Sequence, residues 1–409
     1  MRLQSFILLL VQTTSTFGSP PFKSSAVPKA LISAYLDVET LASEALERTR
    51  EALTKRGRAD KPDTNSCTLG RLKTRKEWNS LTDLERIAYT DAVNCLLSKP
   101  ANTPTSLVPG ARSRFDDFVA SHINQTMTIH YTGSFLSWHR YYTWLYEEAL
   151  RKECGYNGTQ PYWDWALTAQ NGMDTSAIFD GSATSMSGNG AFIAKKPDVI
   201  LGPELGFDPL YMPAGTGGGC VTSGPFKGMR VNLGPVSLNE YGGDLGVNPG
   251  GPFAYNPRCL RRDISTKVNL RFANASSILD LLLKSKSIDR FQSGMQGELS
   301  SGEVGVHGGG HYALGGDPGR DFYTSPGDPA FYLHHGMIDR VWWIWQMMNP
   351  EDRVSGDGVL AGTNTFLDNP PSPKTTREDV IDLGHAGGPP KKIGELLSVV
   401  DGPFCYVYA

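Results

Sequence analysis

The sequence DPAFYLHHGMIDRVWWIWQMM, at residues 328–348, predicts the fold more clearly than any other stretch of the chain. Asp328 can cap a helix, and Pro329 suits the first helical turn. The apolar residues that follow form the stripe of a buried helix face, and His335 lies within it. Residues 135–152, FLSWHRYYTWLYEEALRK, repeat apolar and aromatic residues at the same helical spacing. They predict a second buried helix that directs its histidine, His139, toward the core.

Six of the eight histidines fall into two groups of three. The first group is His122, His130 and His139, and the second is His307, His311 and His335. His307 and His311 are four residues apart, so they face the same way on a helix. The three glycines between them cost roughly 1 kcal/mol each in helix propensity. The surroundings, bound metal included, must therefore hold this helix.

The histidine pattern favours a metal centre over a set of core residues. A single histidine on an apolar helix is more often buried without a ligand role. Two helical groups with no carboxylate at ligand spacing make that alternative weaker. Three imidazoles per metal suit copper or zinc, but binuclear hydrolases usually add carboxylate ligands. All-imidazole ligation is neutral and fairly soft, which favours cuprous ions that can reduce dioxygen. The pattern predicts two copper ions, with O2 as co-substrate.

Three motifs of the chain resemble those of tyrosinases. HYTGSFLSWHRYYTWLYE, at residues 130–147, is similar to the copper-A signature of that family, and DPAFYLHHGMID, at residues 328–339, to its copper-B signature. PYWDW, at residues 161–165, follows copper A as it does in the family. The resemblance covers roughly residues 67–346. It extends to tyrosinases, catechol oxidases and haemocyanins, the type 3 copper proteins, and most of all to short secreted fungal polyphenol oxidases.

The resemblance implies a mainly α fold, in which an antiparallel four-helix bundle with long irregular loops holds a binuclear copper site. Each copper would be bound by one histidine group, with His335 as a ligand and His334 in a supporting role. Asp339, one turn after His335, would either hydrogen-bond to a ligand or anchor an arginine. The implied reaction oxidises small phenolic substrates, namely o-diphenols and as a further class o-aminophenols, to quinones with reduction of O2 to water.

Four further residues are candidates for a catalytic role. In tyrosinases an asparagine directly after the first copper-B histidine, with a nearby glutamate, orients a water that takes the phenol proton. Gly308 occupies that position and has no side-chain acceptor, so a water held by Glu303 or Glu298 would be a poorer base. We therefore expect weak monophenol hydroxylation. Phe322 matches the phenylalanine that shields copper A in plant catechol oxidases, and a plain core aromatic is its alternative role.

Other functions stay open at this point. A full tyrosinase with strong monophenolase activity would share both motifs, and a haemocyanin-like oxygen carrier would use the same coppers. Carriers of that kind are usually large assemblies. A secreted binding or structural protein would require both motifs to arise by coincidence. Turnover of a catechol separates an enzyme from a carrier, and metal analysis tests the last alternative.

The N-terminal region predicts export and a separate helix. Residues 1–19 place Arg2 ahead of a short apolar run and then small residues, which is typical of a signal peptide and too short to span a bilayer. An N-terminal core strand is the alternative. Apolar residues at helical spacing predict an amphipathic helix over residues 31–53.

The dibasic pair Lys55-Arg56 at the end of this helix leaves two possibilities open. Residues 20–56 form either a pro-segment that a protease removes or a permanent helix. Residues 57–409 form the copper-binding catalytic domain in both cases. Only 74 residues follow His335, too few for the large C-terminal domain that plugs the site in many family members. Tyr406-Val407-Tyr408 resembles the tyrosine motif that ends the family's catalytic core.

The six cysteines are an even number, which in an oxidising compartment predicts up to three disulfides without fixing their pairing. No cysteine lies between Cys95 and Cys154, so we expect no thioether to a copper-A histidine. Residues 168–256 are rich in glycine and proline and predict extended loops, held near Cys220 and Cys259. Three glycosylation sequons also fit an extracellular protein; they begin at Asn124, Asn157 and Asn274. Asn124 lies within the predicted metal site, so the sequence predicts no glycan there.

Charge excludes two classes of partner. The 39 Lys and Arg residues nearly balance 42 Asp and Glu residues, for a net charge of -3, and the sequence has no long run of like charge. We therefore expect no nucleic-acid partner and no membrane partner. Hydrophobic residues make up 39% of the chain, enough for the core of one large domain. The oligomeric state is left open.

Overall fold

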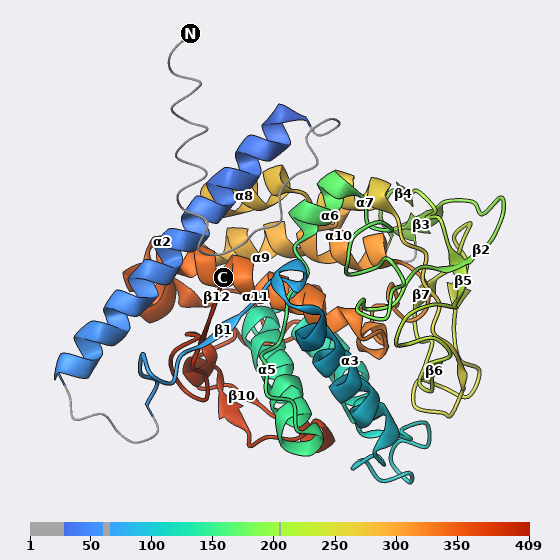
Figure 1. Cartoon of the computed structure of the whole chain (residues 1–409), viewed down its shortest axis with the longest axis horizontal. Coiled ribbons are helices and arrows are strands. Elements are labelled where there is room, and N and C mark those ends of the chain that lie inside the picture. The colour runs from blue at the N-terminus through green and yellow to red at the C-terminus, as the bar shows by residue number, and fades with distance from the viewer. Residues whose placement is uncertain (1–27, 60–65, 204–205) are drawn as a thin grey trace.

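The computed structural model describes residues 28–59, 66–203 and 206–409. The predicted signal peptide lies outside these residues. The fold is mainly α, as the sequence predicts (Figure 1). The described α-helices are α2 (Lys29–Ala59), α3 (Asp83–Ser98), α4 (Arg114–Ile129), α5 (Phe135–Cys154), α6 (Trp165–Asn171), α7 (Thr266–Phe272), α8 (Ala275–Lys284), α9 (Ile288–Gln296), α10 (Gly305–Leu314) and α11 (Ala330–Met348).

Local sequence signals define several of these helix ends. Thr82 and Glu85 form a capping box at the start of α3, and Ser113 and Asp116 form another at the start of α4. At the end of α5 the chain turns at Gly155, which has φ of 69° and donates its N–H to the last turn of the helix. Helix α3 therefore begins at Asp83, directly after its cap.

The strands are short and occur as pairs, most of them on the side of the molecule away from α2 (Figure 1). The long segment predicted to be loops over residues 168–256 contains most of them. One pair is parallel, β1 (Lys73–Arg75) with β12 (Tyr406–Tyr408). The antiparallel pairs are β2 (Gly190–Phe192) with β5 (Gly218–Val221), β3 (Val199–Leu201) with β4 (Leu210–Met212), β6 (Arg230–Val231) with β9 (Arg258–Cys259), β7 (Leu238–Asn239) with β8 (Leu245–Gly246), and β10 (Val380–Ile381) with β11 (Lys391–Lys392).

Three disulfides join segments that are far apart in the sequence. They are Cys67–Cys405, Cys95–Cys154 and Cys220–Cys259, so all six cysteines of the sequence are paired. The second joins α3 to the end of α5, and the third joins β5 to β9 within the loop-rich segment. Each closes a loop whose freedom in the unfolded chain would oppose folding.

Helix α2 is the predicted N-terminal helix, and it lies along one side of the molecule against α8 and α11 (Figure 1). Its buried residues include Tyr35, Val38 and Leu53. Glu39 forms a 2.8 Å ion pair with the buried Arg340 of α11. Arg48 donates hydrogen bonds to the carbonyl oxygens at the end of the same helix. Helix α2 therefore covers α11 through both apolar and polar contacts.

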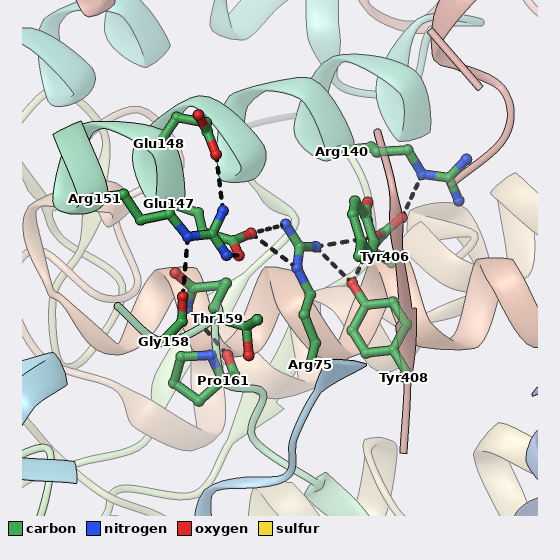
Figure 2. A network of polar contacts seen from close by, with 12 residues as sticks. Arg75, Arg140, Glu147, Glu148, Arg151, Gly158, Thr159, Pro161, Tyr406 and Tyr408 are labelled. Carbon is green, nitrogen blue, oxygen red and sulfur yellow. Dashed lines mark hydrogen bonds and ion pairs between the residues drawn. The ribbon is translucent and has the colours of Figure 1, made fainter. Parts of the chain in front are cut away.

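A buried network of charges ties α5 and α11 to the strand pair β1–β12 (Figure 2). Arg75 on β1 pairs with Glu147 of α5 and with Asp339 of α11. Asp339 also accepts hydrogen bonds from Arg140, at 2.6 Å, and from two tyrosine hydroxyls of β12. Of the two roles that the sequence left open for Asp339, the structure shows the anchoring of arginines. The tyrosine motif of β12 donates the remaining hydrogen bonds to this carboxylate.

Candidate metal centre

The first histidine group lies where α4 meets α5. His122 is on α4, His130 is the residue that ends α4, and His139 is on the first turns of α5. The chain leaves the helical conformation at His130, with φ of -118° and ψ of 141°, which turns the ring back toward the other two. All three side chains are buried, and one ring nitrogen of each lies within 4.8 Å of those of the others.

The second group lies between α10 and α11 and contains four histidines, His307, His311, His334 and His335. Both ring nitrogens of His334 are already engaged. Nδ1 accepts a hydrogen bond from the indole N–H of Trp165 at 3.0 Å, so Nε2 carries the proton and donates it to the carbonyl oxygen of His307 at 2.9 Å. His334 has no free lone pair, and three histidines remain available to a metal.

The glycines of α10 allow this close packing. A Cβ on Gly310 would lie 2.2 Å from the ring of His334, and one on Gly309 would lie 2.7 Å from the Cβ of Phe272. Side chains at these positions would push α10 away from α11 and α7. The packing therefore compensates for the low helix propensity of the three glycines.

Backbone carbonyl groups fix the orientation of four rings. Nδ1 of His122 lies 2.7 Å from the carbonyl oxygen of Tyr323, and Nδ1 of His311 lies 3.1 Å from that of Gly319. His130 and His139 make the same bond to carbonyl groups four residues earlier. A carbonyl oxygen only accepts, so each Nδ1 carries the proton and each Nε2 presents a lone pair.

Four histidines of the two groups have a buried Nε2 atom without any hydrogen-bond partner among the described residues; they are His122, His139, His307 and His335. A buried polar atom left unpaired costs roughly 1–3 kcal/mol. Such atoms are rare in folded proteins, and a cluster of them requires an explanation. A neutral, all-nitrogen donor set of this kind fits bound copper ions.

Burial keeps the rings in the neutral form that a metal ligand needs. It lowers the pKa of His130 to about 3 and the pKa of His311 to about 4. The pKa values of the remaining four histidines of the two groups lie well below the usual value for the same reason. The two groups also adjoin each other, because the rings of His139 and His335 stack with their centroids 4.5 Å apart.

A cavity of about 200 Å³ opens onto both groups. His130, His307 and His311 reach its wall. Its other lining includes six aromatic residues, Tyr131, Phe207, Tyr312, Phe322, Tyr323 and Phe366. This volume and lining suit one aromatic ring with a short substituent.

Of the four residues predicted to be catalytic, two line the cavity and two lie at the surface. Phe322 lines the cavity, and its ring centroid lies 4.5 Å from that of His130. Gly308 lines the cavity on the first turn of α10. Glu298 and Glu303 are exposed and are absent from the described residues that line the cavity. The chain turns away at Gly297, which has φ of 86°, so Glu298 faces solvent near Arg290 at 3.6 Å.

Gln296, which sequence reasoning missed, lines the cavity together with Gly308. Its side-chain oxygen accepts the backbone N–H of Tyr131 at 2.7 Å, and its own carbonyl oxygen accepts the tyrosine hydroxyl at 2.9 Å. A neutral amide gives no sequence signal for acid–base chemistry. Only the glycine that follows and ends α9 hints at a turn here.

Comparison with known proteins agrees with the fold and with the histidine geometry. Residues 112–348 match the family profile described as the common central domain of tyrosinase. The fold and its two histidine groups thus define a tyrosinase-type oxidoreductase, a class whose members use a binuclear copper site and O2 and act on small phenolic substrates. The chain belongs to the tyrosinase family.

Two fungal proteins illustrate the relationship. The chain is 42% identical over 336 residues to tyrosinase P of Aspergillus terreus, an alignment that covers 82% of this chain and 91% of that protein. It is 41% identical over 356 residues to an N-acetyl-6-hydroxytryptophan oxidase of Emericella nidulans, with 85% and 94% covered. Both relatives are therefore matched over most of their length.

A solved structure shows the same fold. It is a mutant polyphenol oxidase from Thermothelomyces thermophila, 43% identical to this chain, with a TM-score of 0.82. The match covers 94% of this chain and 99% of that one. Among the described residues no helix has the length and apolar character needed to cross a membrane.

Proposed function

We propose that this protein is a secreted binuclear copper oxidase that converts o-diphenols to o-quinones with reduction of O2 to water and that hydroxylates monophenols weakly. The observation that carries the proposal is the set of buried Nε2 atoms without partners beside an aromatic cavity. The ligands are His122, His130, His139, His307, His311 and His335. His334 orients His307 through its hydrogen bond to the backbone.

Copper ions held there would supply the electron transfer, with two diphenols oxidised for each O2 reduced to two waters. The chain itself positions the substrate. The ring of Phe322 packs on the ring of His130, so the aromatic ring of a substrate must lie beside this phenylalanine to reach the first histidine group. The aromatic walls exclude bulk water from the reacting oxygens.

The absence of a base near Gly308 supports a catechol oxidase over a tyrosinase. Gln296 cannot take a proton. The carboxylate of Asp321 also lines the cavity, and burial raises the pKa of this carboxyl, but its two oxygens already accept hydrogen bonds from four backbone N–H groups, so no lone pair is left to take a proton from the substrate. Among the described lining residues the remaining carboxylate is Asp208, which is exposed. A monophenol, whose hydroxyl must be deprotonated first, therefore gains little help.

Copper content and relative rates test the proposal. We expect two copper ions per chain after copper loading, turnover of 4-methylcatechol, and at least about 10-fold slower turnover of 4-methylphenol. Turnover of 2-aminophenol tests the second substrate class. Equal rates on 4-methylcatechol and 4-methylphenol would favour a full tyrosinase, and oxygen binding without turnover would favour a carrier. A chain that binds no copper would contradict the proposal altogether.

Export is the remaining part of the proposal. Three disulfides form and persist in oxidising compartments, which supports a secreted protein. Among the three sequons, Asn124 and Asn157 are exposed, which argues against the sequence prediction of no glycan on Asn124. Asn274 is buried at the start of α8, where its side-chain oxygen accepts the N–H of Ser277. Mass spectrometry of the protein secreted by a fungal host should detect glycans on the first two and none on the third.

A further inference from the structure

Arg320 is a buried cation in the wall of the substrate cavity. Its side chain is 4% exposed, and the residue lines the cavity together with the histidines. Its backbone lies between two groups that orient the metal centre, since the carbonyl oxygen of Gly319 accepts from His311 and Phe322 packs on His130. The backbone of Arg320 is therefore held between residues that contact both histidine groups.

The guanidinium of Arg320 has few partners for a buried charge. It makes one ion pair, from Nη2 to Glu240 at 3.5 Å, and Glu240 is 30% exposed. Its Nε is buried with no hydrogen-bond partner among the described residues, and its central carbon lies 4.5 Å above the ring of Tyr241, which is also a polar neighbour of the guanidinium. Arg262, also buried, shows the usual pattern instead, with two short bonds to Asp328.

The carboxylate of Asp321, the next residue in the chain, does not pair with the guanidinium of Arg320. Its oxygens instead accept the backbone N–H groups of Val236 and of Tyr323 in its own loop. The cavity thus combines an aromatic lining with a cation whose donors are only partly used. A carboxylate is the group that a guanidinium binds best, through two parallel N–H···O bonds.

We propose that Arg320 recognises a carboxylate on the substrate, so that the preferred substrates are o-diphenols with a short acidic side chain, of the aryl-alkanoic acid type. This inference rests on the proposed function. Glu240 acts as the stand-in anion when no acidic substrate is bound, and a substrate carboxylate competes with it for the guanidinium.

The test compares two catechols of similar size in the copper-loaded full chain, 3-(3,4-dihydroxyphenyl)propanoate and 4-ethylcatechol. We expect the wild-type kcat/KM to favour the acid. Arg320→Gln should lower the acid-to-neutral ratio of kcat/KM by about 10-fold or more, mainly through KM, because a charge-assisted bond is lost. Arg320→Lys should keep part of the preference, since it retains the charge without the planar fork.

Glu240→Gln provides an independent readout that leaves Arg320 in place. Removal of the competing carboxylate should raise the ratio by about two- to five-fold, the range for a partly exposed ion pair. Arg230→Gln, which removes an exposed arginine of β6 outside the cavity, should leave the ratio at the wild-type value.

The outcomes distinguish an error in the role of Arg320 from an error in the proposed function. An unchanged ratio in Arg320→Gln overturns the assignment. If that variant does not fold, a ratio that fails to rise in Glu240→Gln overturns it instead. Wild-type protein that oxidises neither catechol contradicts the proposed function, whereas oxidation of both with no preference for the acid contradicts only the role of Arg320.

Discussion

Nδ1 of His122 donates a hydrogen bond to the carbonyl oxygen of Tyr323, 2.7 Å away and 201 residues later in the chain. Four residues before Tyr323, the carbonyl oxygen of Gly319 orients His311 of the other histidine group. One short loop therefore sets the ring orientation in both groups, and Phe322 and Arg320 project from the same loop into the cavity wall. The geometry of the metal centre and the shape of the substrate cavity depend on one element.

Substitution of single histidines should separate ligands from supporting residues. We expect His139→Ala and His335→Ala to abolish turnover and to lower copper content to about one ion per chain, because each opens one coordination sphere. His334→Ala should retain both ions, since its nitrogens already serve Trp165 and His307, and should lower activity by about 10- to 100-fold. Elemental analysis and oxygen-consumption rates measure both effects. Full activity in His335→Ala would contradict the ligand assignment.

The sequence predicted the helices and the histidine groups because both follow from local spacing. The helix expected over residues 31–53 extends from Lys29 to Ala59, and α11 buries the predicted apolar stripe. Its N-cap position is held by Pro329 without a side-chain cap, and Asp328, the predicted cap, accepts the N–H of Ala330 and pairs with Arg262. The bonds that orient the rings could not be predicted. They join His122 and Trp165 to groups far away in the chain, and a carbonyl oxygen carries no residue-type signal.

The predicted glutamates show a second limit of the sequence. Glu298 and Glu303 had a suitable distance along the chain from His307, but the turn at Gly297 rotates them to the surface. The cavity wall receives Gln296 instead. Sequence distance fixes the neighbourhood of a residue, whereas the backbone conformation at one glycine decides which side chain enters the site.

Helix α2 should behave as a permanent part of the fold. None of its residues is among the described residues that line the cavity. Arg56, near the end of the helix, forms a 2.7 Å ion pair with Asp401 near the C-terminus. We therefore expect protein cut after Arg56 to keep the helix bound under native conditions and to gain no activity. Gel filtration and rates before and after cleavage measure this, and a rise in activity would restore the inhibitory pro-segment.

The ion pair between Glu39 and Arg340 should account for part of the stability that α2 provides. Glu39→Gln leaves the charge of Arg340, 1% exposed, without its partner. Glu39 itself is 27% exposed, so we expect a loss of about 1–3 kcal/mol in unfolding free energy, below the cost for a fully buried pair. Urea denaturation measures the loss. Glu51→Gln, at an exposed position of the same helix, is the control and should change stability by less than about 0.5 kcal/mol.

Asp339 should make the fold sensitive to acid. Burial alone would raise the pKa of its carboxyl, but Arg140, Arg75 and two tyrosine hydroxyls outweigh burial and hold the pKa below its usual value. A carboxyl whose pKa is depressed by folding stabilises the protein above its unfolded pKa, near 4, and loses that contribution as the pH falls through the folded pKa. We expect wild-type stability to fall as the pH drops below about 4.

Asp339→Asn tests this origin of the acid sensitivity. It should cost about 3–5 kcal/mol at pH 7, because it leaves two buried arginines short of an anion, and it should flatten the decline below pH 4. Unfolding in urea at pH 7, 4 and 3 measures both. Asp83→Asn, whose side chain is 75% exposed, should follow the wild-type curve. An equally steep acid decline in Asp339→Asn would assign the sensitivity to other carboxyls.

Gly308 should limit monophenol hydroxylation. It lines the cavity with Gln296, and neither residue offers a base to the phenol proton. Gly308→Asn supplies a side-chain acceptor that can hold a water, so we expect the monophenol-to-diphenol rate ratio to rise several-fold. Proton transfer in a complete arrangement contributes typically about 10²-fold or more, so the double variant Gly308→Asn, Gln296→Glu should rise further because it adds a carboxylate.

A steric control is required, because a Cβ at position 308 would lie 2.8 Å from the Cβ of Val304. Gly308→Ala introduces the same contact without the amide. If the acceptor is responsible, Gly308→Ala changes the rate ratio little, and Gly308→Asn raises it on both 4-methylphenol and tyramine relative to their catechols. An equal rise in the alanine variant would assign the effect to movement of Val304 and the first turn of α10. Wild-type protein that hydroxylates phenols as fast as it oxidises catechols, with no lag, would show that Gly308 does not limit the reaction.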